Sequence, residues 1–362
     1  MADLNERVAL VTGARVKIGY QIALRLLRCG AMVVATSRFP SDTAKRFAAE
    51  ADFSDWAPRL HVYGVDFRDI VAVERLVGWL LHSLPHLDII INNACQTVRR
   101  PPAYYAHLIA QEKAELLALP EAARHVLKGN EALSHAVAEA SLSIANTESA
   151  TGPHDVRPGH GLGGNSGLLS QVPLVLGDEE HDESLFPLAT HDVNAQQVDL
   201  RDKHSWTFRL HEIPTPEAME VMAINAITPL VLNGKLKPLM ERSPASAKFI
   251  INVSAMEGKF YRWKSPTHPH TNMAKAALNM MTRTSAEDYS KSGIYMNAVD
   301  TGWINDENPL QKARAHADLQ GFQTPIDEID AASRVLDPVL VGVRENVLYF
   351  GKFFKDYAET EW

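Results

Sequence analysis

The sequence predicts an α/β fold, a doubly wound parallel sheet with a long insertion after the fourth strand. Three observations support it. Short apolar segments alternate with helical patterns over the first ninety residues, the alternation resumes near residue 215, and the chain between follows neither pattern. Parallel strands joined by right-handed crossovers bind ligands at their carboxyl ends, so that edge of the sheet is where a site is expected.

The first strand–turn–helix unit is the part of the chain most typical of ligand binding. Val8–Val11 is an apolar run of the kind found in buried parallel strands. Residues 12–19 then turn the chain into a helical pattern that stops at Gly30. Such a turn directs several backbone N–H groups and the positive end of a helix dipole to one point, which suits a phosphate. An ordinary turn without a ligand is the alternative.

Five further segments continue the alternation. Strands are expected at Ala31–Ser37, Leu60–Val65 and Leu87–Ile91, and helices at Thr43–Ala51 and Ile70–Leu84. The strands end beside polar residues, which the topology brings to one edge of the sheet: Arg38, Asp66 and Asn93.

The insertion, residues 99–211, does not read as another strand–helix unit. Its helical part, 103–145, predicts two helices broken near Pro120 and Gly129. The part from 146 to 204 is rich in Gly, His and acidic residues, which is typical of flexible chain, and is expected to be a lid, an interface element or a partly disordered arm. Two apolar segments are candidates for holding it onto the domain: Val172–Leu176 and Trp206–Leu210.

After the insertion the pattern resumes and completes one domain formed by residues 1–98 and 212–362. A helix is expected over Glu217–Met240, with a kink or break at Pro229, and a second over His268–Tyr289. Strands are expected at Lys248–Val253, Ile294–Val299 and Val347–Phe350.

Composition argues against several classes of protein. The chain carries 36 basic and 44 acidic residues, which argues against a nucleic-acid or anionic membrane surface. No apolar run approaches the roughly 20 residues of a membrane helix, and the short start leaves no room for a signal peptide. Two cysteines are too few for a disulfide framework, and no Cys or His spacing predicts a metal site. We expect a cytoplasmic protein.

At this point the motifs resemble a known family, the short-chain dehydrogenase/reductase superfamily. They are Thr12-Gly13-x-x-x-Lys17-x-Gly19, Asn92-Asn93-Ala94, Asn225, Ser254 and Lys275. The resemblance covers about 1–98 and 212–362. It implies a Rossmann-like fold that binds NAD or NADP, a small carbonyl or alcohol substrate, and a homo-oligomer, dimer or tetramer, built partly through the helices that carry Asn225 and Lys275.

The charge after the second strand favours NADP(H) over NAD(H). NAD enzymes usually carry a carboxylate there, whereas this chain has Arg38, with Arg15 and Lys17 in the turn. A 2′-phosphate would gain charge-assisted contacts from these three side chains. A solvated role for Arg38 is the alternative. By the resemblance, the other cofactor-binding residues are Gly13, Ile18 and Gly19 at the pyrophosphate, Asp66 and Phe67 at the adenine, Asn93 and Ala94 at a ribose, Lys275 at the nicotinamide ribose, and the backbone of Ile304 at the carboxamide.

The catalytic motif departs from the family pattern. The resemblance implies catalytic roles for Asn225, Ser254 and Lys275, but threonine, Thr271, stands where the family has its tyrosine acid. A phenol titrates near 10, and an aliphatic hydroxyl is a far weaker acid, so Thr271 is not expected to ionise. Replacement proton donors lie between Ser254 and Lys275, and each has a structural role as its alternative: Tyr261, His268 and His270.

Two functions follow from these observations. The first is an NADP(H)-dependent oxidoreductase with a non-standard proton donor, favoured by the retained Asn, Ser and Lys. The second is a catalytically inactive NADP(H)-binding sensor or scaffold that contacts a partner through the insertion, favoured by the missing tyrosine. Two further departures bear on the cofactor site, because Lys17 and Cys95 stand where the family usually has glycine.

Overall fold

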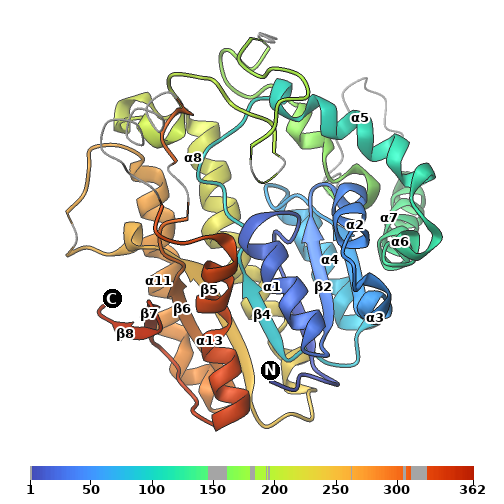
Figure 1. Ribbon diagram of the computed structural model, residues 1–362, viewed down its shortest axis with the longest axis vertical. Helices are drawn as coiled ribbons and strands as arrows, with labels where there is room; N and C mark the ends of the chain where they lie inside the picture. The colour runs from blue at the N-terminus through green and yellow to red at the C-terminus, as the bar shows by residue number, and fades with distance from the viewer. Residues whose placement is uncertain are drawn as a thin grey trace.

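The computed structural model describes residues 2–145, 161–179, 184–192, 194, 196–261, 263–304, 307–310 and 324–362. Helices cover both faces of a central sheet, and the elements of the insertion, drawn in green, lie along the upper and right-hand parts of the view in Figure 1. No helix among these residues is both long and apolar enough to cross a bilayer. The same residues hold no group of three or more His, Cys, Asp or Glu side chains suited to a metal ion.

The sheet has eight strands in the order β3-β2-β1-β4-β5-β6-β7-β8. Their bounds are β1 Val8–Val11, β2 Met32–Ser37, β3 Leu60–Gly64, β4 Ile89–Asn92, β5 Lys248–Ser254, β6 Ile294–Asp300, β7 Phe353–Lys355 and β8 Ala358–Thr360. All neighbours pair in parallel except β7 and β8. The order reverses between β1 and β4, so the predicted doubly wound sheet is confirmed, with its switch point at the end of β1.

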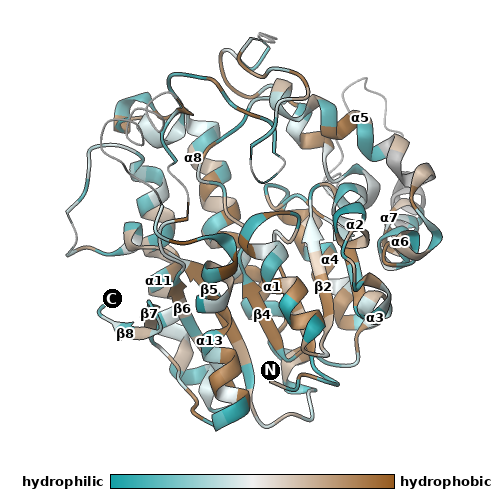
Figure 2. Cartoon of the chain, viewed as in Figure 1, coloured by the Kyte–Doolittle hydropathy of each residue, from teal (hydrophilic) through white to brown (hydrophobic). Residues whose placement is uncertain are grey.

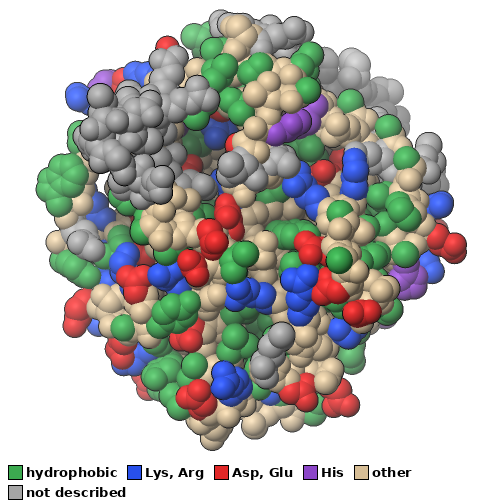
Figure 3. All heavy atoms as spheres, viewed as in Figure 1, with side chains coloured by type: hydrophobic (Ala, Val, Ile, Leu, Met, Phe, Trp, Pro, Cys, Tyr) green, Lys and Arg blue, Asp and Glu red, His purple; other side chains and the backbone are tan. Residues whose placement is uncertain are grey.

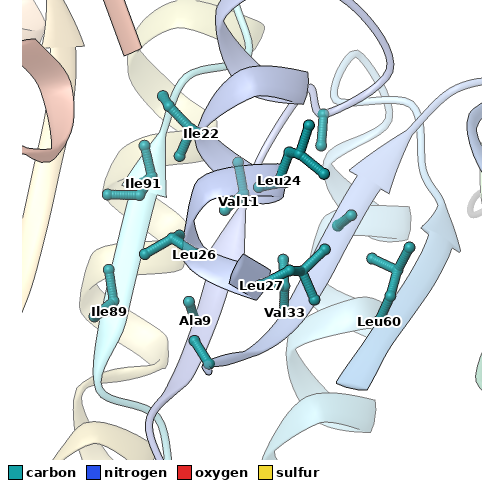
Figure 4. Packing of buried hydrophobic residues seen from close by; sticks show 14 of the residues in the cluster. Ala9, Val11, Ile22, Leu24, Leu26, Leu27, Val33, Leu60, Ile89 and Ile91 are labelled. Carbon is teal, nitrogen blue, oxygen red and sulfur yellow. The ribbon is translucent and has the colours of Figure 1, made fainter. Parts of the chain in front are cut away.

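Alternate strand residues pack the two faces of the sheet. The side chains of Ala9 and Val11 lie on the first face, in a hydrophobic cluster with α1 (Lys17–Arg28) and α13 (Glu328–Glu345). Figure 4 shows Ile22 and Leu26 of α1 in this cluster. Val8 and Leu10 belong to the second cluster, beneath α4 (Ile70–Ser83), α9 (Thr228–Lys235), α10 (Lys237–Glu241) and α11 (Pro269–Ser290). Both faces are therefore buried, which explains why the strands are apolar runs rather than alternating ones, as their brown colour in Figure 2 shows.

Over residues 99–145, all of which the structure describes, the insertion forms three α-helices where two were predicted. They are α5 Pro102–Ala118, α6 Glu121–His125 and α7 Lys128–Ala145. The break near Pro120 is confirmed, but Gly129 lies inside α7. A Cβ atom at Gly129 would stand 2.4 Å from the hydroxyl of Tyr63, so this glycine allows a close approach to β3 rather than ending a helix.

Two other boundaries differ from prediction. The helix expected from Thr43 begins earlier, as α2 (Pro40–Ala48), with proline in its first turn, and a short α3 (Phe53–Trp56) follows it. The last strand is not Val347–Phe350. Gly351, at φ +66°, bends the chain while its N–H donates to the Met296 carbonyl of β6 at 2.8 Å, and the regular pairing with β6 begins at Phe353, the start of β7.

The described parts of the insertion pack against the sheet domain. The backbone N–H of Val62 on the edge strand β3 donates to the carbonyl of Val126 at 2.9 Å, and the N–H of Gly64 donates to the Asn130 side chain at 2.8 Å. Leu119, Ala123, Val126 and Leu127 belong to the same cluster as Phe47 and Trp56 of the domain. The insertion thus covers one free edge of the sheet.

Of the two segments expected to hold the insertion in place, one does so. Trp206 stacks on His268 with ring centroids 3.8 Å apart, and the N–H of His268 donates to the carbonyl of Phe208 at 2.8 Å. Val172, Leu174 and Leu176 are exposed instead, so the prediction for Val172–Leu176 is wrong. The nearby anchor is polar, a buried ion pair between Arg99 and Asp178 at 2.7 Å. Residues 146–160, which the prediction of a flexible part included, lie outside the described residues.

Candidate active site

A cleft of about 370 Å³ opens at the carboxyl ends of the first strands. Every residue predicted to bind the cofactor lines it except Lys275: Gly13, Arg15, Lys17, Ile18, Gly19, Arg38, Asp66, Phe67, Asn93, Ala94 and Ile304. Basic and acidic side chains are interspersed over the face of the molecule seen in Figure 3. Because its lining residues follow β1 and β4, the cleft lies at the switch point of the sheet, where open α/β sheets bind their ligands.

The glycine turn forms a rigid cradle at the base of this cleft. A Cβ atom at Gly19 would lie 2.2 Å from the Gly13 carbonyl oxygen, and one at Gly13 would lie 2.9 Å from Cα of Ala94. The Thr12 hydroxyl oxygen accepts hydrogen bonds from the backbone N–H groups of Asn93 and Ala94 at 2.9 and 3.0 Å, and the Asn93 side chain donates to the carbonyl of Thr12 at 3.0 Å. Only glycine fits at the two positions, and the ends of β1 and β4 are tied together.

Lys17 occupies a backbone conformation that favours glycine. Its φ is +53°, in the left-handed region, at the first residue of α1. The side chain lines the cleft. The departure from the family pattern at this position therefore places a cationic side chain in the cleft at the expense of a strained backbone.

The basic residues expected at a 2′-phosphate have different partners. Arg15 forms an ion pair with Asp42 at 2.8 Å. Arg38 donates to two neutral oxygens of the insertion, the hydroxyls of Tyr105 and Ser170, each at 3.0 Å. Within the described chain no carboxylate lies within ion-pair distance of Arg38. Arg38 is therefore the better placed of these two arginines to receive an anion from outside the protein.

Asp66 is fully buried and bound to Arg68. The Arg68 guanidinium donates to both carboxylate oxygens, with distances between 2.5 and 3.1 Å, and also reaches Glu220 on α8 (Thr215–Met222) at 3.2 Å. Burial raises the pKa of Asp66, but the charge and hydrogen bonds of Arg68 outweigh it and hold the pKa below its usual value. The Asp66 carboxylate is consequently ionised and fixed at the end of β3.

Two of the predicted catalytic residues, Ser254 and Lys275, lie together at the end of β5. The Ser254 hydroxyl donates to the Asn279 side-chain oxygen at 2.5 Å, and the Lys275 ammonium donates to the carbonyl of Val253 at 2.8 Å. Thr271, Lys275 and Asn279 are spaced by four on α11 and all are buried. The Thr271 hydroxyl is buried without a hydrogen-bond partner among the described residues.

Asn279 is a residue that sequence reasoning missed. The signal was available, because Asn279 follows Lys275 by one helical turn, on the face that meets Ser254. Its side-chain nitrogen has no partner within the described chain. The buried side-chain nitrogen of Asn279 is therefore left unsatisfied beside Ser254, as is the Thr271 hydroxyl two turns earlier on α11, and such groups are expected to pair with water or a ligand.

Asn225 lies in a π-helical turn, Ala223–Ile227, between α8 and α9. Its side-chain oxygen accepts from the N–H of Gln96 at 2.8 Å and its side-chain nitrogen donates to the Gln96 carbonyl at 3.2 Å. Pro229 falls in the first turn of α9, directly after the π turn, so the backbone stays helical at Pro229 and the interruption comes after Lys235 instead. Because Gln96 lines the cleft, Asn225 holds one wall of it from behind.

The three replacement proton donors are in different surroundings. Tyr261 is exposed, its hydroxyl lies 3.0 Å from the Lys259 ammonium, and it is not among the lining residues of the cleft. His268 has its Nδ1 atom 2.9 Å from the carbonyl of Trp206, and burial lowers its pKa. His270 is buried, with Nε2 3.3 Å from Glu217 and Nδ1 without a partner in the described structure.

A parallel α/β sheet with a glycine cradle at its switch point defines a nucleotide-binding protein of the Rossmann type. Residues 7–115 match the family model of short chain dehydrogenases, and residues 202–332 match that of enoyl-(acyl carrier protein) reductases. The chain belongs to the short-chain dehydrogenase/reductase family.

Several proteins resemble this chain in sequence. An uncharacterised protein of Acanthamoeba polyphaga mimivirus is 29% identical over 351 residues, which cover 93% of this chain and 63% of that protein. A fatty acyl-CoA reductase of Acinetobacter baylyi is 32% identical over 98 residues, which cover 27% of this chain and 32% of the reductase. This chain thus spans less than two thirds of the length of either relative.

Solved structures share the fold at low identity. A dehydrogenase/reductase from Sinorhizobium meliloti has a TM-score of 0.57 at 18% identity, covering 97% of this chain and 94% of its own. The NADP complex of RhlG from Pseudomonas aeruginosa has a TM-score of 0.56 at 17% identity, covering 97% and 95%. At this identity the likeness establishes the fold alone.

Proposed function

We propose that the protein is an NADP(H)-dependent oxidoreductase that transfers hydride between nicotinamide and a carbonyl or alcohol substrate. The observation that carries the proposal is the single cleft that runs from Arg38 past the glycine cradle to Ile304. Gly13 and Gly19 allow the tight turn beside β4, because a Cβ atom at either position would clash with Gly13, Asn93 or Ala94, and such a turn presents backbone N–H groups to a pyrophosphate. When bound, the nicotinamide supplies or accepts the hydride.

The preference for NADP(H) rests on Arg38. Its hydrogen-bond partners are neutral hydroxyls, and the Asp66 carboxylate with which its charge also interacts is already paired with Arg68, so Arg38 remains available for a 2′-phosphate. Arg15 contributes less, because Asp42 already compensates its charge. Lys17 adds a second cation nearer the pyrophosphate turn.

For the proton donor we propose His270. A histidine exchanges protons near neutral pH, and a carboxylate partner orients its ring and stabilises its charged form. Glu217 occupies that place on one side of the ring, and the opposite nitrogen is buried and unpaired within the described residues. Ser254 would then hold the substrate oxygen, and Lys275 the nicotinamide ribose.

Titration of the purified protein with NADPH and NADH tests the cofactor assignment, and turnover of a panel of aldehydes and ketones tests the reaction. We expect NADPH to bind at least tenfold more tightly than NADH, and His270→Gln to lower kcat at least a hundredfold. His268→Gln is the matched control. Tight binding of NADPH with no turnover of any carbonyl compound would instead support the sensor or scaffold.

We also propose that the chain forms a homo-oligomer. α8, the π turn, α9 and α11 carry large apolar side chains that are exposed in the single chain: Met219, Ile227, Leu230, Met273 and Met280. Their burial between copies would remove this apolar surface from water. Light scattering on the wild-type protein and on Met273→Lys measures the oligomeric state. A monomer in both samples contradicts the proposed oligomer.

A further inference from the structure

We infer that the insertion completes the cofactor site, with Tyr105 and Ser170 as positioning residues that hold Arg38 for the 2′-phosphate. The inference rests on the proposed NADP(H) preference and goes beyond it, because it assigns cofactor selectivity to a segment outside the sheet domain. Both residues belong to the insertion, and both are buried.

The Arg38 guanidinium is held by two residues of the insertion and by Phe39, its neighbour in the sheet domain. Nη2 donates to the Tyr105 hydroxyl and Nη1 to the Ser170 hydroxyl, each at 3.0 Å. The guanidinium carbon lies 4.6 Å from the centroid of the Tyr105 ring and 5.7 Å from that of Phe39. These two rings are themselves stacked, with centroids 5.8 Å apart. The guanidinium plane is thus restrained by two hydrogen bonds and two aromatic faces.

This restraint changes what Arg38 can do. An unrestrained arginine loses much rotamer freedom when it binds a ligand, whereas an arginine already held in one conformation loses little. A guanidinium has five N–H donors, so the two recorded bonds leave others for a phosphate. Because both partners are neutral, the positive charge is not compensated by them.

The part of the insertion that carries Ser170 is anchored to the ends of two neighbouring strands. Leu162 pairs with Val65, and the N–H of Asp66 donates to the Gly161 carbonyl at 2.6 Å. The Ser170 hydroxyl also accepts from Arg68, the partner of Asp66, at 3.0 Å. Arg38, Ser170 and Asp66 are therefore joined in one hydrogen-bonded chain that crosses the cleft end of β2 and β3.

A buried ion pair secures the following stretch of the insertion. Arg99 donates to both carboxylate oxygens of Asp178 at 2.7 Å, and the N–H groups of Leu174 and Val175 also donate to that carboxylate. Segment 161–179 is thus docked on the sheet domain in the arrangement in which Ser170 contacts Arg38. By thermodynamic linkage, a ligand that binds Arg38 in this arrangement also stabilises the docked segment.

The test compares Tyr105→Phe and Ser170→Ala with Tyr104→Phe. Tyr104 is a matched control because it is the neighbouring tyrosine and its ring lies against Arg100 instead of Arg38. Dissociation constants for NADPH and NADH are measured by fluorescence titration. We expect each of the two variants to weaken NADPH binding about 3–10-fold, since each leaves one guanidinium N–H without its partner, and to change NADH binding less than about twofold. The control is expected to keep the wild-type ratio of the two constants.

Hydrogen exchange on the wild-type protein gives a second readout that needs no variant. NADPH is expected to slow amide exchange over 161–179 more than saturating NADH does, while exchange in α13, on the other face of the sheet, responds equally to both. Equal protection of 161–179 by the two cofactors, or variants with an unchanged NADPH to NADH ratio, would overturn the inference. A wild-type protein that does not distinguish the two cofactors would instead overturn the proposed preference itself.

Discussion

Lys17 combines a strained backbone with a charge in the cleft, so Lys17→Gly should have two opposite effects. A left-handed conformation costs an L-residue about 1–2 kcal/mol, and glycine avoids this cost. Glycine also has greater freedom in the unfolded chain, which lowers the free energy of unfolding by about 0.5–1 kcal/mol. The net gain of roughly 0.5–1 kcal/mol corresponds to a rise in Tm of about 1 °C for a chain of this size.

The same substitution removes a cation that lines the cleft. Loss of one charge-assisted contact to a phosphate costs about 1.5–3 kcal/mol, so the Kd for NADPH should rise tenfold or more. Differential scanning calorimetry measures the first effect and isothermal titration the second. Lys17→Ala separates them, because alanine loses the charge and keeps the strain. A lower Tm in Lys17→Gly, or unchanged affinity in both variants, would refute the reasoning.

Three other measurements probe the site. Thr271→Tyr should raise kcat at least tenfold if this position faces the reacting oxygen, and an unchanged kcat would place proton transfer elsewhere. NADPH should slow alkylation of the exposed, cleft-lining Cys95 at least tenfold in a Cys29→Ser background, and equal rates with and without NADPH would contradict the cofactor site. Burial, together with Arg100, lowers the pKa of His204 to about 4. The unfolded chain binds this proton near pH 6.5, so acid favours unfolding, and urea denaturation should show about 2 kcal/mol less stability at pH 5 than at pH 7 from this group. His204→Gln should remove that difference, and an unchanged pH dependence would exclude His204 as its source.

The sheet and the cofactor cleft were predictable because local patterns determine them. The apolar runs at Val8–Val11 and Ile294–Val299 are buried on both faces, and the glycine turn has one sterically permitted arrangement. The terminal strand was misplaced because Val347–Phe350 has strand-like composition. Only the turn at Gly351 and the pairing with β6 decide where that strand starts.

The contribution of the insertion could not be predicted from local pattern. Ser170 and Asp178 lie in polar, glycine-rich sequence that is typical of flexible chain, yet their partners, Arg38 and Arg99, are 132 and 79 residues away. Such contacts depend on the tertiary fold and leave no periodic signal. Asn279 is an intermediate case, since its helical spacing was visible but its contact with Ser254 was not.

The backbone contact between Val62 and Val126 has a consequence for attempts to shorten this protein. Excision of residues 99–211 to obtain a minimal dehydrogenase would uncover the outer side of β3 and strip neighbours from Trp56 and Phe47. An unprotected strand edge next to fresh apolar surface is a template for intermolecular pairing. The shortened chain is therefore expected to precipitate rather than to fold as a smaller domain.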